Sequence, residues 1–247
     1  MPDQHVTIVR QPQTLAEVAV QRFVSLAEAE VKERGRFSVA LSGGSTPKAM
    51  FKLLASNDYS DQVAWDKVFV FWGDERFVPP DDQESNYRMA RETLLDHVPL
   101  PAANIFPVPT VGSTPEAAAQ AYAETITAFF GRETPRFGLI LLGMGPDGHT
   151  ASLFPGHPEP SAPGDELVIA VRDSPKPPPD RLSFTYRLIN AAHHVLFLVG
   201  GADKAATVQQ VLEGPRRVAE LPSQGVQPDG TLEWLLDEAA AQELQQS

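Results

Sequence analysis

The chain has 247 residues and no cysteine, which excludes disulfides, thiolate nucleophiles, iron–sulfur clusters and cysteine-type zinc sites. Its formal net charge of −12 at pH 7 disfavours nucleic acid and anionic membranes as partners. We expect a cytoplasmic protein, because residues 1–10 lack the pattern of a secretory signal and no apolar run approaches about 18 residues.

Short apolar runs alternate with amphipathic stretches along the whole chain. Five runs are predicted to be strands, and three of them are nearly continuous in Val, Ile, Leu and Phe, which is typical of strands covered on both faces. The predicted strands are Phe37–Ser42, Lys67–Gly73, Phe137–Gly143, Glu166–Val171 and His194–Gly200.

Helices are predicted between these strands. The first begins with the capping box at Thr14 and ends at Gly35, and another starts near Thr114 and runs to about Phe130. Further helices are predicted at Pro47–Ser56, Asn86–Leu95, Ala202–Leu212 and Leu232–Ala240. The alternation indicates an α/β fold with a mostly parallel sheet and helices on both faces. Because no interdomain linker or repeat is found, we expect a single domain, residues 1–247.

A glycine-rich turn follows the first predicted strand. It consists of Ser42, Gly43, Gly44, Ser45 and Thr46 and precedes a predicted helix. The first turn of a helix has unpaired N–H groups and a partial positive charge, so this turn is a candidate phosphate-binding site. The alternative is an ordinary βα turn with a threonine cap.

Charged residues follow the second predicted strand directly. Asp74, Glu75 and Arg76 stand at its carboxyl end, where open α/β sheets bind ligands. The alternative interpretation is a solvated loop that contains a local ion pair.

A third candidate, Gly143–Thr150, follows the third predicted strand and contains G-x-G-x-x-G. We reject a dinucleotide site there, because Pro155 and Gly156 would end any helix within about one turn. His149 is the side chain best suited to move protons near neutral pH, and Asp147 stands two residues before it. The alternative is a structural or merely exposed histidine.

Two cations and a proline-rich segment complete the candidates. Lys204 and Arg181 lie near predicted strand ends and either reach an anion or are solvated. The run Ser174–Pro179 is predicted to be a stiff surface loop, with a wall or lid beside a site as the alternative. No spacing typical of a metal site is found.

Taken together, the motifs resemble the 6-phosphogluconolactonase family. The similarity rests on SGGSTP, WGDERFVP, SNY, LGMGPDGHTASLFPG, RLSFTYRLINAA, FLVGGADKA and LPSQGVQPDG-TLEWLLDEAA, in order from Ser42 to about Ala240. It implies a Rossmann-like fold shared with glucosamine-6-phosphate deaminases, and metal-free, cofactor-free hydrolysis of 6-phospho-D-glucono-1,5-lactone.

The resemblance also assigns roles to single residues. It makes His149 the catalytic histidine and matches Arg76 to the arginine of the family's Asp-Glu-Arg motif. From the chemistry of lactone opening we expect His149 to be the general base, Asp147 to orient it, and Arg76 or backbone N–H groups to stabilise the oxyanion. It identifies Ser42, Gly43, Gly44, Ser45 and Thr46 as the phosphate loop and matches Lys204 to the lysine near the phosphate. We also predict that Asp74 and Arg181 bind substrate, while the stretch SFTYRLIN after Arg181 departs from the family pattern. The implied partner is a phosphorylated sugar lactone, and we expect a monomer.

Two rival functions are weighed against this interpretation. In glucosamine-6-phosphate deaminases the corresponding loop resembles GHIAFNEP, with a carboxylate five residues after the histidine, whereas this chain has Phe154 there. A sugar-phosphate sensor on the same scaffold usually carries a DNA-binding segment, and this acidic chain has no basic helix-turn-helix.

Overall fold

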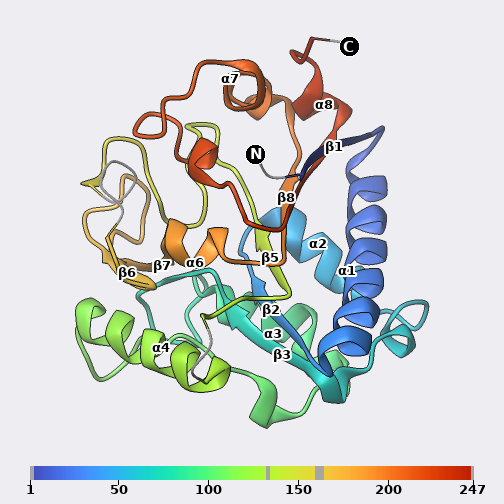
Figure 1. Ribbon diagram of the computed structural model, residues 1–247, viewed down its shortest axis with the longest axis vertical. Coiled ribbons are helices and arrows are strands. Elements are labelled where there is room, and N and C mark those ends of the chain that lie inside the picture. Colours follow the sequence, from blue (N-terminus) through green and yellow to red (C-terminus); the bar gives the residue numbers. More distant parts are fainter. Residues whose placement is uncertain (1–2, 132–133, 159–163, 246–247) are drawn as a thin grey trace.

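The computed structural model in Figure 1 describes residues 3–131, 134–158 and 164–245. Its centre is a parallel sheet with the strand order β1-β9-β8-β5-β2-β3. In that order the strands are Asp3–Val9, Thr231–Asp237, His194–Val199, Leu139–Leu142, Phe37–Leu41 and Val68–Trp72. Every residue of the central strands β2 and β5 is buried, as their continuous apolar sequences predict. The predicted parallel α/β fold is confirmed.

Helices flank this sheet (Figure 1). They are α1 (Pro12–Arg34), α2 (Ser45–Leu54), α3 (Asn86–Thr93), α4 (Pro115–Phe130), α6 (Tyr186–Asn190), α7 (Ala205–Glu213) and α8 (Glu238–Ala241). Short 3₁₀ turns include Ser60–Gln62, Trp65–Lys67, Leu95–His97, Ala102–Asn104, Ala202–Lys204 and Pro222–Gly225. Within the described ranges, no helix has the length and apolar character needed to cross a bilayer.

Helix α1 ends where the sequence predicts but begins earlier. Gly35 adopts a left-handed φ of 73° and its N–H donates to the Val31 carbonyl at 2.9 Å, which is a glycine C-cap. The helix begins at Pro12, so the predicted capping box at Thr14 lies inside the first turn. Proline at the first helical position carries no N–H to satisfy, and this favours the earlier start.

A second, antiparallel sheet has the strand order β4-β7-β6. Its strands are β4 (Asp74–Arg76), β7 (Arg181–Phe184) and β6 (Val168–Val171). The predicted strand Glu166–Val171 corresponds to β6, while β7 was not predicted. The Phe184 N–H donates to the Gly73 carbonyl at 2.8 Å and joins the small sheet to the chain leaving β3.

The predicted helix Leu232–Ala240 is wrong for most of its length. Residues 231–237 form β9, which pairs in parallel with both β1 and β8, and only the short α8 follows. Trp234 of β9 stacks on Phe197 of β8, with ring centroids 3.8 Å apart. Pairing on both sides and this buried stack favour the strand over the local helical spacing.

Candidate active site

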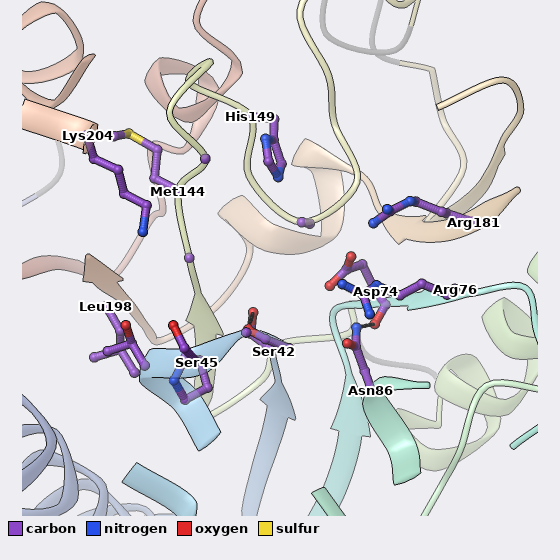
Figure 2. Close-up of a pocket in the computed structure, with 17 residues that line it drawn as sticks. Ser42, Ser45, Asp74, Arg76, Asn86, Met144, His149, Arg181, Leu198 and Lys204 are labelled. Carbon is purple, nitrogen blue, oxygen red and sulfur yellow. Dashed lines mark hydrogen bonds between the residues drawn. The ribbon is translucent and has the colours of Figure 1, made fainter. Parts of the chain in front are cut away.

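A pocket of about 240 Å³ opens at the carboxyl ends of β2, β3, β5 and β8 (Figure 2). This edge is where ligands bind in open α/β sheets. The lining residues are Ser42, Gly43, Gly44, Ser45, Thr46, Pro47, Asp74, Arg76, Asn86, Gly143, Met144, Gly145, His149, Ala151, Arg181, Leu198 and Lys204. All the predicted site residues except Asp147 therefore line one pocket, and Asp147 hydrogen-bonds the His149 ring.

The glycine-rich turn forms one end of the pocket. Gly44 has a φ of 103°, which a residue with a Cβ rarely adopts, and it is the N-cap of α2. Its carbonyl accepts the Lys48 N–H at 3.1 Å, so the N–H groups of Ser45 and Thr46 precede the first helical hydrogen bond. Helix α2 therefore begins at Ser45, two residues before the predicted start, and directs unpaired N–H groups at the pocket.

Lys204 extends this positive end. It stands at the end of a 3₁₀ turn, directly before α7, and its Nζ donates to the Gly200 carbonyl at 3.0 Å. Figure 2 shows the Lys204 side chain reaching toward the side of the pocket where Ser45 lies. A helix N-terminus and an ammonium group together suit a phosphate dianion.

Strand β4 supplies the charged groups at the other end. Asp74 is buried and its Oδ2 accepts the Ser152 hydroxyl at 2.8 Å. Arg76 donates Nη1 to the Glu84 carbonyl at 2.5 Å, and its buried Nε has no hydrogen-bond partner in the described part of the chain. The guanidinium group of Arg76 therefore lines the pocket without all of its N–H donors being used by the protein.

Glu75, between these two residues, points away from the pocket and holds helix α3. Its carboxyl group accepts the backbone N–H groups of Arg76, Asn86 and Tyr87 at 2.7–2.8 Å and the Ser85 hydroxyl at 3.2 Å. Burial raises the pKa of Glu75 to about 7, and the three backbone hydrogen bonds oppose that rise. Glu75 therefore fixes the position at which α3 starts.

Asn86 is a pocket residue that the sequence analysis did not assign to the site. Its Nδ2 donates to the Asp74 carbonyl at 3.0 Å, and a Cβ on Gly43 would overlap its side-chain amide. Gly43 is therefore required for close approach of the turn to α3. The SNY motif could have indicated that Asn86 belongs to the site. It places a polar residue at the first position of α3, and α3 begins next to the charged strand β4.

His149 and Asp147 form a hydrogen-bonded pair. Nδ1 of His149 lies 2.5 Å from Oδ1 of Asp147. A carboxylate only accepts, so we assign a proton to Nδ1; in the neutral ring Nε2 is then the nitrogen that can accept a proton. Among the described residues no group hydrogen-bonds Nε2. This is the arrangement of a general base with an orienting carboxylate.

The pKa of Asp147 lies below its ordinary value. Burial raises it, but the hydrogen bond from His149, the charge that the imidazole carries when it is protonated, and the nearby ammonium of Lys176 together outweigh burial. Asp147 is therefore ionised at neutral pH. Residues 150–157 form only turns and the Thr150–Leu153 bridge, so no helix begins directly at the glycine motif.

Arg181 lies in the pocket wall but most of its donors are used by the protein. Nε donates to the Pro178 carbonyl, and Nη2 donates to the carbonyls of Lys176 and Pro177, at 3.1–3.2 Å. No acceptor for Nη1 is found within the described ranges. A substrate contact of Arg181 would therefore come from Nη1 alone. Among all the residues that the structure describes, no group of three or more His, Asp or Glu side chains is placed so that it could hold a metal ion.

Comparison with known proteins agrees with this geometry. Residues 10–234 match the family model of glucosamine-6-phosphate isomerases/6-phosphogluconolactonase. The chain is 41% identical over 247 residues to a 6-phosphogluconolactonase from Nostoc sp., covering 99% of this chain and 96% of that protein. It is 42% identical over 242 residues to one from Synechocystis sp., covering 97% and 98%.

A solved structure of 6-phosphogluconolactonase from Trypanosoma brucei is 30% identical, with a TM-score of 0.86 over 99% of this chain and 100% of that one. The chain belongs to the glucosamine-6-phosphate isomerase/6-phosphogluconolactonase family. This membership confirms the family resemblance and the Rossmann-like fold inferred from the sequence.

Phe154 follows His149 by five residues, the spacing of the carboxylate in the deaminase pattern. It occupies the position of the deaminase-type carboxylate, is fully buried and packs on His149 with ring centroids 4.7 Å apart. His149 therefore meets an aromatic ring where the deaminase pattern would bring an acid.

Proposed function

We propose that this chain hydrolyses 6-phospho-D-glucono-1,5-lactone to 6-phospho-D-gluconate, in the oxidative branch of the pentose phosphate pathway. The observation that carries the proposal is one pocket with a phosphate-type cradle at Ser42–Thr46 and an Asp147–His149 pair facing it. Lys204 strengthens the cradle. This arrangement suits a ligand that has a phosphate at one end and a reactive carbonyl at the other.

The reaction follows from the state of His149. Nε2 removes a proton from water as the water oxygen bonds to C1, and the carbonyl becomes a tetrahedral oxyanion stabilised by Arg76. Collapse of the oxyanion breaks the bond between C1 and the ring oxygen. The imidazolium returns its proton to that oxygen as it becomes the 5-hydroxyl group, and Asp147 holds the ring in place throughout.

Binding of the remote phosphate supports this chemistry. The N–H groups of the α2 terminus, with Lys204, anchor the phosphate, and this fixes C1 relative to His149. The interaction is made far from the reacting carbon. Phosphate binding therefore contributes mainly to substrate affinity and orientation.

Phe154 disfavours the deaminase alternative. Ring opening of an amino sugar and release of ammonia need an acid beside the histidine, and a fully buried phenylalanine stands there. Hydrolysis of a lactone needs one group that first acts as the base and then as the acid. His149, oriented by Asp147, supplies that group.

The deciding experiment measures acid release from freshly generated 6-phosphogluconolactone against spontaneous hydrolysis, with EDTA present. We expect EDTA-resistant turnover and about a 10²–10⁴-fold lower kcat in His149→Ala. His97→Ala, an exposed histidine far from the pocket, is the matched control and should keep full activity. Release of ammonia from glucosamine 6-phosphate, or near-full turnover in His149→Ala, would overturn the proposal.

The proposal includes a monomer that works in the cytoplasm. Light scattering of the eluting protein during size exclusion tests this part, and a stable dimer at assay concentrations would contradict it.

A further inference from the structure

The proline loop, Ser174–Pro179, reaches the Asp147–His149 pair through Lys176. The Nζ atom of Lys176 lies 3.2 Å from Nδ1 of His149 and 3.5 Å from Oδ1 of Asp147. The loop connects β6 to β7 of the small sheet. Of the two interpretations of this run offered by the sequence, the contact supports a wall beside the site.

The backbone of Lys176 is held from both sides. Arg181, which is 4% exposed, donates to the carbonyls of Lys176, Pro177 and Pro178. The Ser174 hydroxyl donates to the Lys176 carbonyl at 3.0 Å and accepts its N–H at 3.2 Å. The ammonium group therefore extends toward the pair from a fixed point of the chain.

The ammonium acts against the carboxylate on the same imidazole. A carboxylate 2.5 Å from Nδ1 stabilises the imidazolium form, and an imidazolium cannot act as a base. A cation 3.2 Å from the same atom disfavours that form. The carboxylate and the ammonium therefore have opposite effects on a second proton at His149.

Other charged groups face the same pocket from neighbouring elements. They are Asp74 and Arg76 of β4, Arg181 of β7 and Lys204 before α7. Of the cations in residues 3–131, 134–158 and 164–245, Lys176 is the one within hydrogen-bond range of the imidazole. Its removal therefore changes the balance of charge at His149 most directly.

We propose that Lys176 is a positioning residue whose ammonium, fixed beside the ring, opposes a second proton on His149 and so favours the neutral imidazole beside Asp147. Arg181 acts one step further away, by holding the loop that carries Lys176. The inference rests on the proposed role of His149 as the base.

The direct test is the titration of His149 in the ligand-free protein, followed by NMR of its Cε1–H resonance and assigned by its loss in His149→Ala. Lys176→Met removes the charge and keeps an unbranched side chain, while Lys176→Arg keeps the charge. We expect Lys176→Met to move the titration midpoint upward by about one pH unit, the size of one charge about 4 Å away in a partly exposed site. Lys176→Arg and the exposed-lysine control Lys52→Met should leave the midpoint unchanged.

The pH profile of kcat/KM is the second readout. The acidic limb of Lys176→Met should move by the same amount, so activity falls about tenfold more at pH 6 than at pH 8. A midpoint that stays in place or moves down overturns the proposal, as does Lys176→Arg behaving like Lys176→Met. A raised KM at every pH with an unmoved midpoint would make Lys176 a substrate ligand instead.

The two proposals fail in different ways. The NMR titration uses no substrate, so a shifted midpoint in a protein without lactonase activity would reject the proposed reaction and keep the effect of Lys176. An active enzyme with an unshifted midpoint would reject the role of Lys176 alone.

Discussion

Replacing Glu75 by glutamine is expected to remove a pH dependence of stability that the wild-type protein carries. The pKa of the buried carboxyl rises from 4.5 to about 7 in the folded state. Below about pH 4.5 the group is protonated in both the folded and the unfolded chain. As the pH rises, the unfolded chain ionises first, so the free energy of unfolding falls until the folded group has also ionised above about pH 7.

The size of the effect follows from the two pKa values. Each pKa unit corresponds to about 1.4 kcal/mol, so the full loss of stability through Glu75 is about 3 kcal/mol between pH 4.5 and 8. Glutamine has no such titration. The free energy of unfolding of Glu75→Gln relative to wild type should therefore increase with pH by about that amount.

Urea unfolding followed by tryptophan fluorescence at pH 5, 6, 7 and 8, at constant ionic strength, measures this difference. Glu28→Gln, an exposed glutamate on α1, is the control and should show no change with pH relative to wild type. The other titrating groups are the same in all three proteins, so their contributions cancel in the difference in free energy of unfolding between each variant and wild type. A difference between Glu75→Gln and wild type that stays constant from pH 5 to 8 would refute the reasoning.

Three substitutions in the pocket test its parts. Lys204→Ala should raise KM about 10- to 100-fold with little change in kcat, since a charge-assisted hydrogen bond is worth about 1.5–3 kcal/mol, and an unchanged KM in steady-state assays would contradict phosphate binding. Gly145→Ala adds a methyl group that overlaps the His149 ring, so kcat should fall about 10²-fold while circular dichroism stays native, and a kcat within a factor of two of wild type would disprove the overlap. In Gly43→Ala the added methyl group overlaps Asn86, so the free energy of unfolding should fall by about 1–3 kcal/mol and the Tm by several degrees. An unshifted melting curve would show that the turn can move.

The sequence was sufficient to predict strands β2, β3, β5 and β8 of the parallel sheet and the edge that carries the site, but neither β1 nor β9. The runs at β2, β3 and β5 are short and apolar, and each is followed by a glycine within two residues. An apolar run and the polar residues that follow it can be recognised from neighbouring residues in the sequence. Parallel strands end at the same edge of a sheet, so the polar residues that follow them meet there. The candidate residues at these ends consequently converged on one pocket.

The carboxyl-terminal strand could not be predicted in the same way. Leu232, Leu235 and Leu236 have the spacing of a helix face, while Leu232 and Trp234 also fit strand alternation. The choice is made by β1, at the opposite end of the chain, which pairs with β9 along its full length. A partner so distant in sequence leaves no local signal.

The contacts of Lys176 and Asn86 were hidden for a similar reason. Lys176 stands among prolines that indicate only a stiff loop, and its approach to His149 depends on the β6–β7 hairpin folding beside the parallel sheet. Asn86 is placed by the buried carboxyl group of Glu75, and the depth of that burial cannot be read from its neighbours in sequence.

The division of the pocket between two sheets has a consequence for how such a protein can change. The turn at Ser42–Thr46 and the histidine loop extend from the parallel sheet, whereas Arg76, Arg181 and Lys176 all belong to the small antiparallel sheet or its hairpin. Substitutions in that hairpin alter the charges that oppose the imidazole and leave the anion cradle intact. A lineage can therefore exchange one half of the pocket for new chemistry while it continues to recognise phosphorylated sugars with the other half.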